Sequence, residues 1–145
     1  MNEAISHYLT DDHRRCDHLL ATCEAKIAAS TWNAADEATA TFREALLRHF
    51  AMEEEILFPE LEQVNAMASG PTDVMRMEHR QMCQLLDELT EAVHARDPDT
   101  CFGDLETLHM ISQQHNAKEE GILYPLADQS LQDGTDTLVE RFHRI

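Results

Sequence analysis

Histidine and glutamate recur in this chain at a spacing that suits metal binding. His49 precedes Glu53 by four residues, and His115 precedes Glu119 by the same interval. Residues four apart on an α-helix lie on one face, one turn from each other. Imidazole nitrogen and carboxylate oxygen are ligands of iron, manganese and zinc. Each pair could therefore hold one side of a metal ion, although a lone pair of this kind is commonly a hydrogen-bonded pair on a helix surface.

An internal repeat distinguishes these two pairs from chance occurrences. Residues 49–59 match residues 115–125 at an offset of 66, with seven of eleven positions identical. The same offset relates His13 to His79, and each of these histidines follows a carboxylic acid and precedes an arginine. A duplicated helical hairpin would produce this pattern. We therefore expect two similar halves, related by an approximate two-fold axis along a bundle.

The composition favours helices as the elements that carry these residues. The chain has only four glycines and four prolines, and it is rich in residues that favour helix. We expect an all-α, up-down-up-down four-helix bundle in a single domain, residues 1–145. The predicted helices span residues 2–29, 34–64, 72–95 and 100–129, with a short terminal helix at 135–144. Asn33 is the predicted N-cap of the second helix, and residues 65–71 are predicted to form the second loop.

Helical periodicity places the histidines and glutamates on the inner faces of these helices. Each inner stripe is apolar except near these residues; in the last helix it comprises Leu108, Ile111, His115, Glu119, Ile122 and Leu126. A buried ionised glutamate is costly unless a cation compensates its charge. Residues equally distant from the turn between antiparallel helices lie at one height. Counting from the predicted turns brings six side chains to one cross-section, and these are the predicted metal ligands: His13, His49, Glu53, His79, His115 and Glu119.

Four imidazoles and two carboxylates in a two-fold arrangement suit two metal ions. Each ion would take two histidines, and the two glutamates would bridge the ions. We expect two iron ions joined by an oxo or hydroxo bridge, with manganese or zinc as alternatives. About five ligands per iron leave one octahedral position for O2, NO or peroxide. An alternative interpretation is a purely structural metal site, but such a site needs no open coordination position.

Several other residues could form an alternative metal site or assist this one. Ferritin-like sites use Glu-x-x-His, and that spacing occurs three times, in Glu91/His94, Glu106/His109 and Glu140/His143. The first two pairs have no counterpart in the repeat and point away from the inner face, so we expect them at the surface. Cys16 and Cys83 are either core residues or thiols with a redox or NO role. Asp17 either orients an imidazole or is exposed.

These motifs resemble those of the hemerythrin-like proteins, also called the HHE cation-binding domain. The similarity runs from Asp12 to Pro125, and it implies that the six residues above are di-iron ligands. Oxygen-carrying hemerythrins have a fifth histidine one turn before the position of His79, where this chain has Met75. The set of four histidines and two glutamates is more similar to bacterial di-iron proteins of iron-centre repair and nitrosative stress.

Charge and hydropathy narrow the expected partners. The formal net charge is −17, from 11 basic and 28 acidic residues, which disfavours nucleic acid and anionic membranes. Without an apolar run of membrane-spanning length or a secretion signal, we expect a cytoplasmic protein with reduced cysteines. The expected function is binding of, or reaction with, O2, NO or peroxide in oxidative or nitrosative stress. The alternatives are iron donation or storage, iron-sulphur-centre repair, and a di-iron oxidase or peroxidase-like enzyme with a redox partner protein. Reversible binding and turnover are both compatible with this site, as is any oligomeric state.

Overall fold

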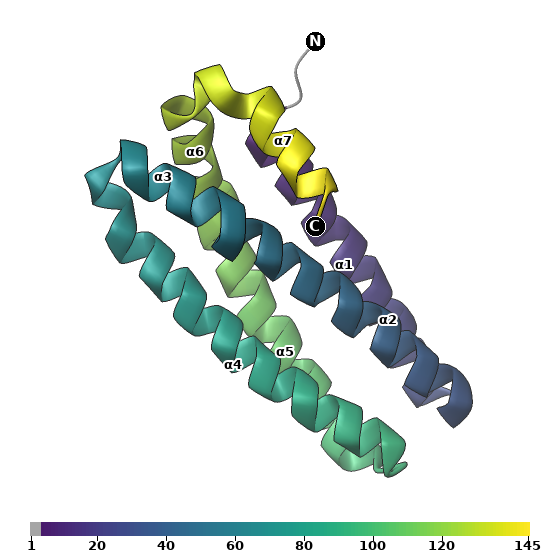
Figure 1. Ribbon diagram of the computed structural model, residues 1–145. Helices are drawn as coiled ribbons and strands as arrows, with labels where there is room; N and C mark the ends of the chain where they lie inside the picture. The colour runs from purple at the N-terminus through teal and green to yellow at the C-terminus, as the bar shows by residue number, and fades with distance from the viewer. Residues whose placement is uncertain (1–3) are drawn as a thin grey trace.

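Four long antiparallel helical rods make up the bundle, and short turns join each rod to the next (Figure 1). The computed structural model describes residues 4–145, so the predicted helix start at residue 2 lies outside the described residues. The rods are formed by α1 (Ile5–Ala28), α2 with α3 (Trp32–Ala51 and Phe58–Val64), α4 (Ser69–His94), and α5 with α6 (Pro98–Lys118 and Tyr124–Ser130). This is the predicted up-down-up-down topology.

A π-helical segment interrupts the second and fourth rods at equivalent positions. Met52–Leu57 separates α2 from α3, and Glu119–Leu123 separates α5 from α6. Pro59 follows the first segment and Pro125 follows the second. Proline has no backbone N–H, so a carbonyl one turn earlier loses its usual partner and a wider turn is favoured. Each segment contains one of the two predicted glutamate ligands, so the irregular backbone lies at the centre of the bundle.

The turn between α1 and α2 and the turn between α4 and α5 lie at the same end of the bundle and are also duplicated. After α1, Ser30 adopts φ 56°, and after α4, Arg96 adopts φ 57°. In both turns the next residue donates its N–H to a carbonyl five residues earlier, which is the Schellman arrangement. This turn brings Thr31 to the N-cap position of α2, so the predicted cap at Asn33 is wrong. The Asn33 side chain instead accepts a hydrogen bond of 3.1 Å from Arg96.

The second predicted loop is shorter in the structure than in the prediction. Ser69, Gly70 and Pro71 form the first turn of α4 rather than a loop. Backbone N–H groups in the first turn have no partner inside a helix, so a proline costs nothing there. In the third turn, Asp97 caps α5 by accepting a hydrogen bond from the backbone N–H of Thr100.

Two apolar clusters fill the bundle, one on each side of the histidines along its axis. One cluster lies toward the α1–α2 and α4–α5 turns and includes Leu20, Phe42 and Leu86. The other lies toward the opposite end, where the short helix α7 (Thr135–His143) packs against α1 and the segment Met52–Leu57 (Figure 1). The predicted C-terminal helix is therefore confirmed, and it covers one face of the second cluster.

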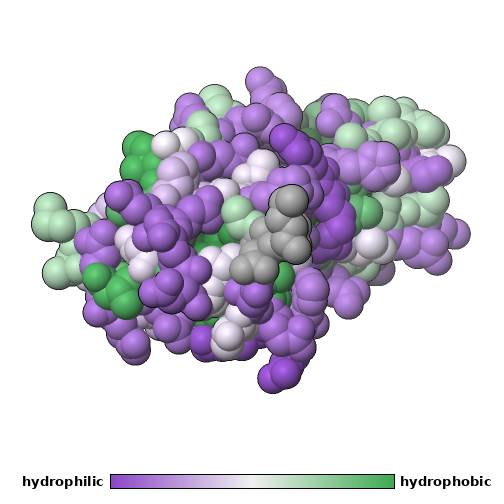
Figure 2. All heavy atoms as spheres, turned by 90° about the horizontal axis from the view of Figure 1, so that it is seen from above, coloured by the Kyte–Doolittle hydropathy of each residue, from purple (hydrophilic) through white to green (hydrophobic). Residues whose placement is uncertain are grey.

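The surface of the bundle is mainly polar. Seen from above the view of Figure 1, hydrophilic side chains cover most of the visible face, with hydrophobic ones in separate patches (Figure 2). Among residues 4–145, no helix is both long enough and apolar enough to cross a membrane.

Candidate metal centre

The six predicted ligands meet in one cross-section of the bundle, between the two apolar clusters. Each of them is at most 4% exposed. Their ligand atoms form two groups, and within each group all atoms lie within 4.8 Å of one another. His13 and His49 belong to the first group, and His79 and His115 belong to the second. Both glutamates, Glu53 and Glu119, belong to both groups.

Each glutamate lies between one histidine of each half. Glu119 Oε1 is 3.0 Å from His13 Nε2 and 3.2 Å from His115 Nε2. Glu53 Oε1 is 3.4 Å from His49 Nε2 and 3.1 Å from His79 Nε2. Because both carboxylates face both histidine pairs, this geometry fits two cations that share two bridging glutamates.

A carboxylate on a neighbouring rod orients each of the four imidazoles, and these carboxylates obey the 66-residue offset too. Nδ1 of every histidine donates a hydrogen bond of 2.6–2.8 Å to its carboxylate. The pairs are His13 with Glu120, His49 with Asp12, His79 with Glu54, and His115 with Glu78. Such contacts fix the tautomer of a metal-binding histidine. With the proton on Nδ1, the lone pair of Nε2 faces the centre.

The inward-facing atoms need a positive charge at the centre. In neutral imidazoles, four Nε2 lone pairs would face two carboxylates, with no hydrogen between them. Four buried atoms of this centre have no hydrogen-bond partner: Glu53 Oε1, Glu119 Oε2, His79 Nε2 and His115 Nε2. Each such buried group costs about 1–3 kcal/mol. These four atoms carry unpaired lone pairs on oxygen and nitrogen, which fit a pair of divalent or trivalent metal ions.

Protons take the place of metal when no metal is present. Burial lowers the pKa of His49, but the charge of Glu53 and the hydrogen bonds to Asp12 and Glu53 raise it overall to about 10. Burial likewise opposes protonation of His79, while hydrogen bonds to Glu53 and Glu54 raise its pKa to about 9. Burial raises the pKa of Glu53, and the nearby charge of His49 lowers it well below its usual range. The site therefore attracts cations of either kind.

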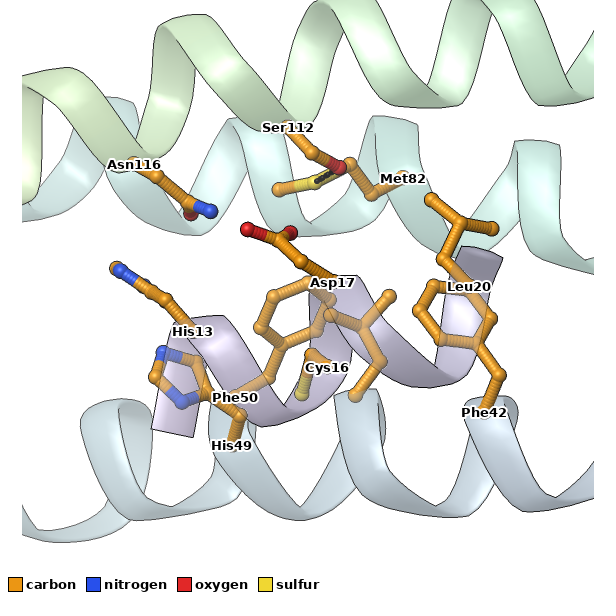
Figure 3. A pocket seen from close by; sticks show the side chains of 11 residues that line it. His13, Cys16, Asp17, Leu20, Phe42, His49, Phe50, Met82, Ser112 and Asn116 are labelled. Carbon is orange, nitrogen blue, oxygen red and sulfur yellow. Dashed lines mark hydrogen bonds between the residues drawn. The ribbon is translucent and has the colours of Figure 1, made fainter. Parts of the chain in front are cut away.

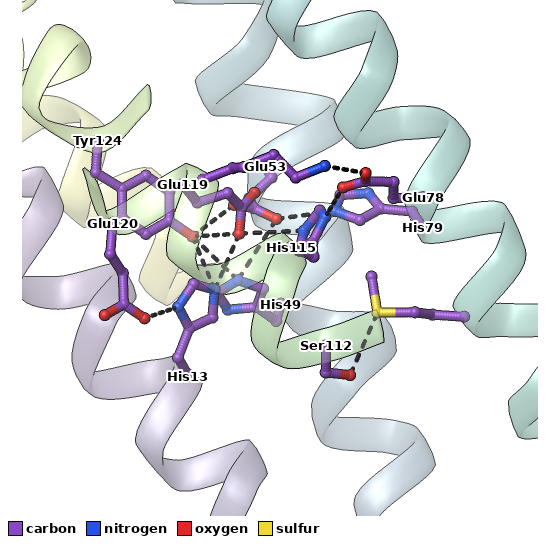
Figure 4. A network of polar contacts seen from close by, with 12 residues as sticks. His13, His49, Glu53, Glu78, His79, Ser112, His115, Glu119, Glu120 and Tyr124 are labelled. Atoms are coloured by element: carbon purple, nitrogen blue, oxygen red, sulfur yellow. Dashed lines mark hydrogen bonds and ion pairs between the residues drawn. The ribbon is translucent and has the colours of Figure 1, made fainter. Parts of the chain in front are cut away.

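Tyr124 is a residue of the centre that sequence reasoning missed. Its side chain is 0% exposed, and its hydroxyl points from α6 into the first group (Figure 4). The hydroxyl donates a hydrogen bond of 2.6 Å to Glu53 Oε2. Burial and the nearby charges of Glu119 and Glu53 raise the pKa of Tyr124 well above its usual range. The internal repeat could have identified it, because Tyr124 occupies the position that Phe58 has in the first half, and the two side chains differ by a hydroxyl. The same offset would also have identified the four orienting carboxylates.

The other residues singled out from sequence lie outside this cluster. Glu120, rather than Asp17, accepts the hydrogen bond from His13, and Asp17 is exposed. All six residues of the Glu-x-x-His pairs are exposed, which confirms the prediction made for Glu91/His94 and Glu106/His109. The four cysteines are free thiols. Burial raises the pKa of Cys16 to about 12, so this side chain stays a neutral thiol at physiological pH.

A small cavity adjoins the first histidine pair, His13 and His49 (Figure 3). Its volume is about 20 Å³, enough for one water molecule or a diatomic molecule. Its lining residues are His13, Cys16, Asp17, Leu20, Phe42, Leu46, His49, Phe50, Met82, Ser112 and Asn116. Cys16 thus lies beside the centre, and Cys83 is not among the lining residues.

Comparison with known protein families agrees with this geometry. The family model described as the hemerythrin HHE cation binding domain matches residues 4–127. Neither curated proteins nor solved structures give a match. The family match contains all six clustered residues, their four orienting carboxylates and Tyr124. Since it covers well over half of the sequence, this chain belongs to the hemerythrin HHE cation-binding domain family.

Proposed function

We propose that this protein holds two iron ions with the six clustered residues and uses them to bind, or react with, O2, NO or peroxide. The observation that carries the proposal is the cavity of about 20 Å³ beside His13 and His49. A space of that size admits a diatomic molecule or peroxide, and it excludes an organic substrate. The cellular setting we propose is the cytoplasm under oxidative or nitrosative stress.

Each group of residues would have a distinct role in metal binding. Two histidines would hold each ion, and Glu53 and Glu119 would hold both. Iron bound there would supply redox chemistry and an exchangeable coordination position. Four carboxylates hold the imidazoles with their Nε2 atoms inward, and they increase the basicity of these nitrogens. The two apolar clusters on either side keep bulk water away from the centre.

Burial of the centre favours retention of the metal over its donation. An iron donor or repair protein needs ligands that a recipient can reach, and none of the six residues is more than 4% exposed. A di-iron oxidase or peroxidase-like enzyme, served by a redox partner protein, is the second candidate. The buried polar cluster and the small cavity are compatible with it.

The test is the metal content and visible spectrum of protein loaded anaerobically with ferrous iron. We expect about two irons per chain and a spectrum that changes in air or on addition of NO. A change that reverses under argon indicates a reversible binder, whereas a change that persists until a reductant is added indicates redox turnover. Binding of zinc alone, or of no metal, would contradict the proposal.

A matched pair of variants links the iron to the six residues. His115→Ala should lose iron, because it removes one of the four inward Nε2 atoms. His109→Ala lies on the same helix, α5, but at an exposed position of a Glu-x-x-His pair. It should retain both irons. Loss of iron in His109→Ala and not in His115→Ala would assign the metal to the ferritin-like spacing.

A further inference from the structure

The duplication is broken at one position inside the centre. Tyr124 and Phe58 are counterparts at the 66-residue offset, both are 0% exposed, and both follow a π-helical segment. The Phe58 ring stacks near His79, with 6.0 Å between ring centroids, and offers no polar atom. The Tyr124 ring stacks near His13 at 5.5 Å and carries a hydroxyl. The two histidine pairs therefore have different neighbours on this side.

The Tyr124 hydroxyl oxygen lies close to a ligand atom of every member of the first group (Figure 4). Its distances are 3.0 Å to His13 Nε2, 3.3 Å to His49 Nε2, 2.6 Å to Glu53 Oε2 and 3.0 Å to Glu119 Oε1. Two ligand atoms at right angles, each about 2.1 Å from one metal ion, are about 3.0 Å apart. These four separations are close to that value, so the oxygen has the spacing of a fifth corner around one ion.

We propose that Tyr124 is a further metal ligand, whose phenolate oxygen binds the ion held by His13 and His49. The proposal rests on the two-metal function proposed above. When the metal–oxygen bond forms, the phenol O–H bond breaks and the proton leaves to water. The ion held by His79 and His115 gains no such ligand, because Phe58 stands at the equivalent position. The two metal positions are therefore chemically unequal within a nearly symmetric frame.

The cavity stays open under this arrangement. Tyr124 approaches the first histidine pair from α6, beyond Glu119 along the fourth rod. The cavity is lined by Ser112 and Asn116, which precede Glu119 on that rod. The phenol and the cavity thus lie on opposite sides of the His13–His49 pair (Figures 3 and 4). Two histidines, two glutamates and the phenolate would make five protein ligands for this ion, so its sixth octahedral position would remain for a small molecule in the cavity, in place of the oxo or hydroxo bridge.

The test is the absorption and resonance Raman spectrum of the full chain loaded with ferric iron. A ferric phenolate absorbs strongly in the visible range, and excitation in that band enhances the ring vibrations of the bound tyrosine. We expect both signals in the wild-type protein and their complete loss in Tyr124→Phe, with two irons retained. The chain has two tyrosines, so Tyr8→Phe is a complete matched control and should keep both signals.

The outcomes separate this proposal from the one on which it rests. If two irons bind and the wild-type protein shows no phenolate signals, Tyr124 serves only as a hydrogen-bond donor to Glu53. The ligand proposal is then overturned, and the proposed function stands. If no iron binds, both proposals fail. If Tyr124→Phe does not fold, the wild-type Raman spectrum decides by itself, because Tyr8→Phe identifies which tyrosine gives the signals.

Discussion

The chain builds one apolar surface twice and covers only the first copy. The first copy lies under α7 and consists of Ile5, Tyr8, Leu9, Met52, Ile56 and Leu57. The second copy consists of the residues 66 positions later, which line a surface pocket of about 220 Å³: Pro71, Val74, Met75, Lys118, Ile122 and Leu123. Every member of one set has its counterpart in the other.

Equivalent residues of the two copies are buried to different extents, because α7 covers only the first copy. Ile56 is 6% exposed beneath α7, whereas its counterpart Ile122 is 66% exposed. Met52 is fully buried, whereas its counterpart Lys118 is half-exposed and pairs with Glu78. The inward-facing histidines and glutamates, by contrast, are buried equally in both halves. Apart from Tyr124 and its counterpart Phe58, the interior of the duplicated bundle is thus symmetric, and its outer layer is set by the single helix that packs on one side.

The largest effect should come from removing the side chain that anchors α7. Phe142 is 0% exposed, and its ring stacks on Tyr8 with 5.5 Å between centroids. Phe142→Ala should lower the free energy of unfolding by about 3–5 kcal/mol, through lost burial and the cavity left behind. Urea unfolding at constant metal load measures this change. Phe102→Ala, at a position that is 42% exposed, is the control and should cost much less. Equal costs would mean that α7 does not pack as described.

A pair of equivalent isoleucines tests the comparison directly. Ile56→Ala should lower the free energy of unfolding by about 2–4 kcal/mol, because the side chain is buried beneath α7. Ile122→Ala should change it by no more than about 0.5 kcal/mol, because the side chain is largely exposed. The same urea unfolding experiment measures both. A large cost for Ile122→Ala would show that something covers the second copy in solution.

The sequence predicts the interior of the bundle well, because two independent regularities apply there. The spacing of four between His49 and Glu53 selects one helix face, and the 66-residue offset repeats that choice in the second half. Heights counted from the turns then bring the six side chains to one level. Together these regularities led to the cluster that the structure contains, although metal binding by these residues is still a proposal.

The outer layer could not be predicted in the same way. Constant helical periodicity places Ile122 inside, but the π-helical segment Glu119–Leu123 shifts the phase, so that Leu123 is 2% exposed instead. Periodicity also says nothing about where α7 packs. The cap and loop errors at Asn33 and at residues 69–71 have a related cause, because the geometry of the preceding turn decides where a helix begins.

The orienting carboxylates test whether the interior is as symmetric as the distances indicate. Asp12 and Glu78 are counterparts, and each accepts a 2.8 Å hydrogen bond from a histidine Nδ1. Asp12→Asn and Glu78→Gln should each weaken metal affinity by about 10–100-fold, because the imidazoles lose orientation and basicity. Competition with a coloured chelator measures the affinity. Asp136→Asn, at an exposed position of α7 away from the centre, is the matched control and should have no effect. An effect in one half alone would contradict a symmetric interior.

The smallest expected effect concerns the duplicated turns. Ser30 adopts φ 56° and is exposed, so Ser30→Gly should raise the free energy of unfolding by about 0.5–1 kcal/mol by relieving left-handed strain. Arg96 has the same backbone conformation, but its guanidinium bonds Asp36 at 2.7 Å and lies 5.9 Å from the centre of the Trp32 ring. Arg96→Gly gives up both contacts, so it should show no net gain. Thermal unfolding at constant metal load compares the two variants. Equal gains would mean that the Arg96 contacts contribute nothing, and the two turns would then differ in sequence alone.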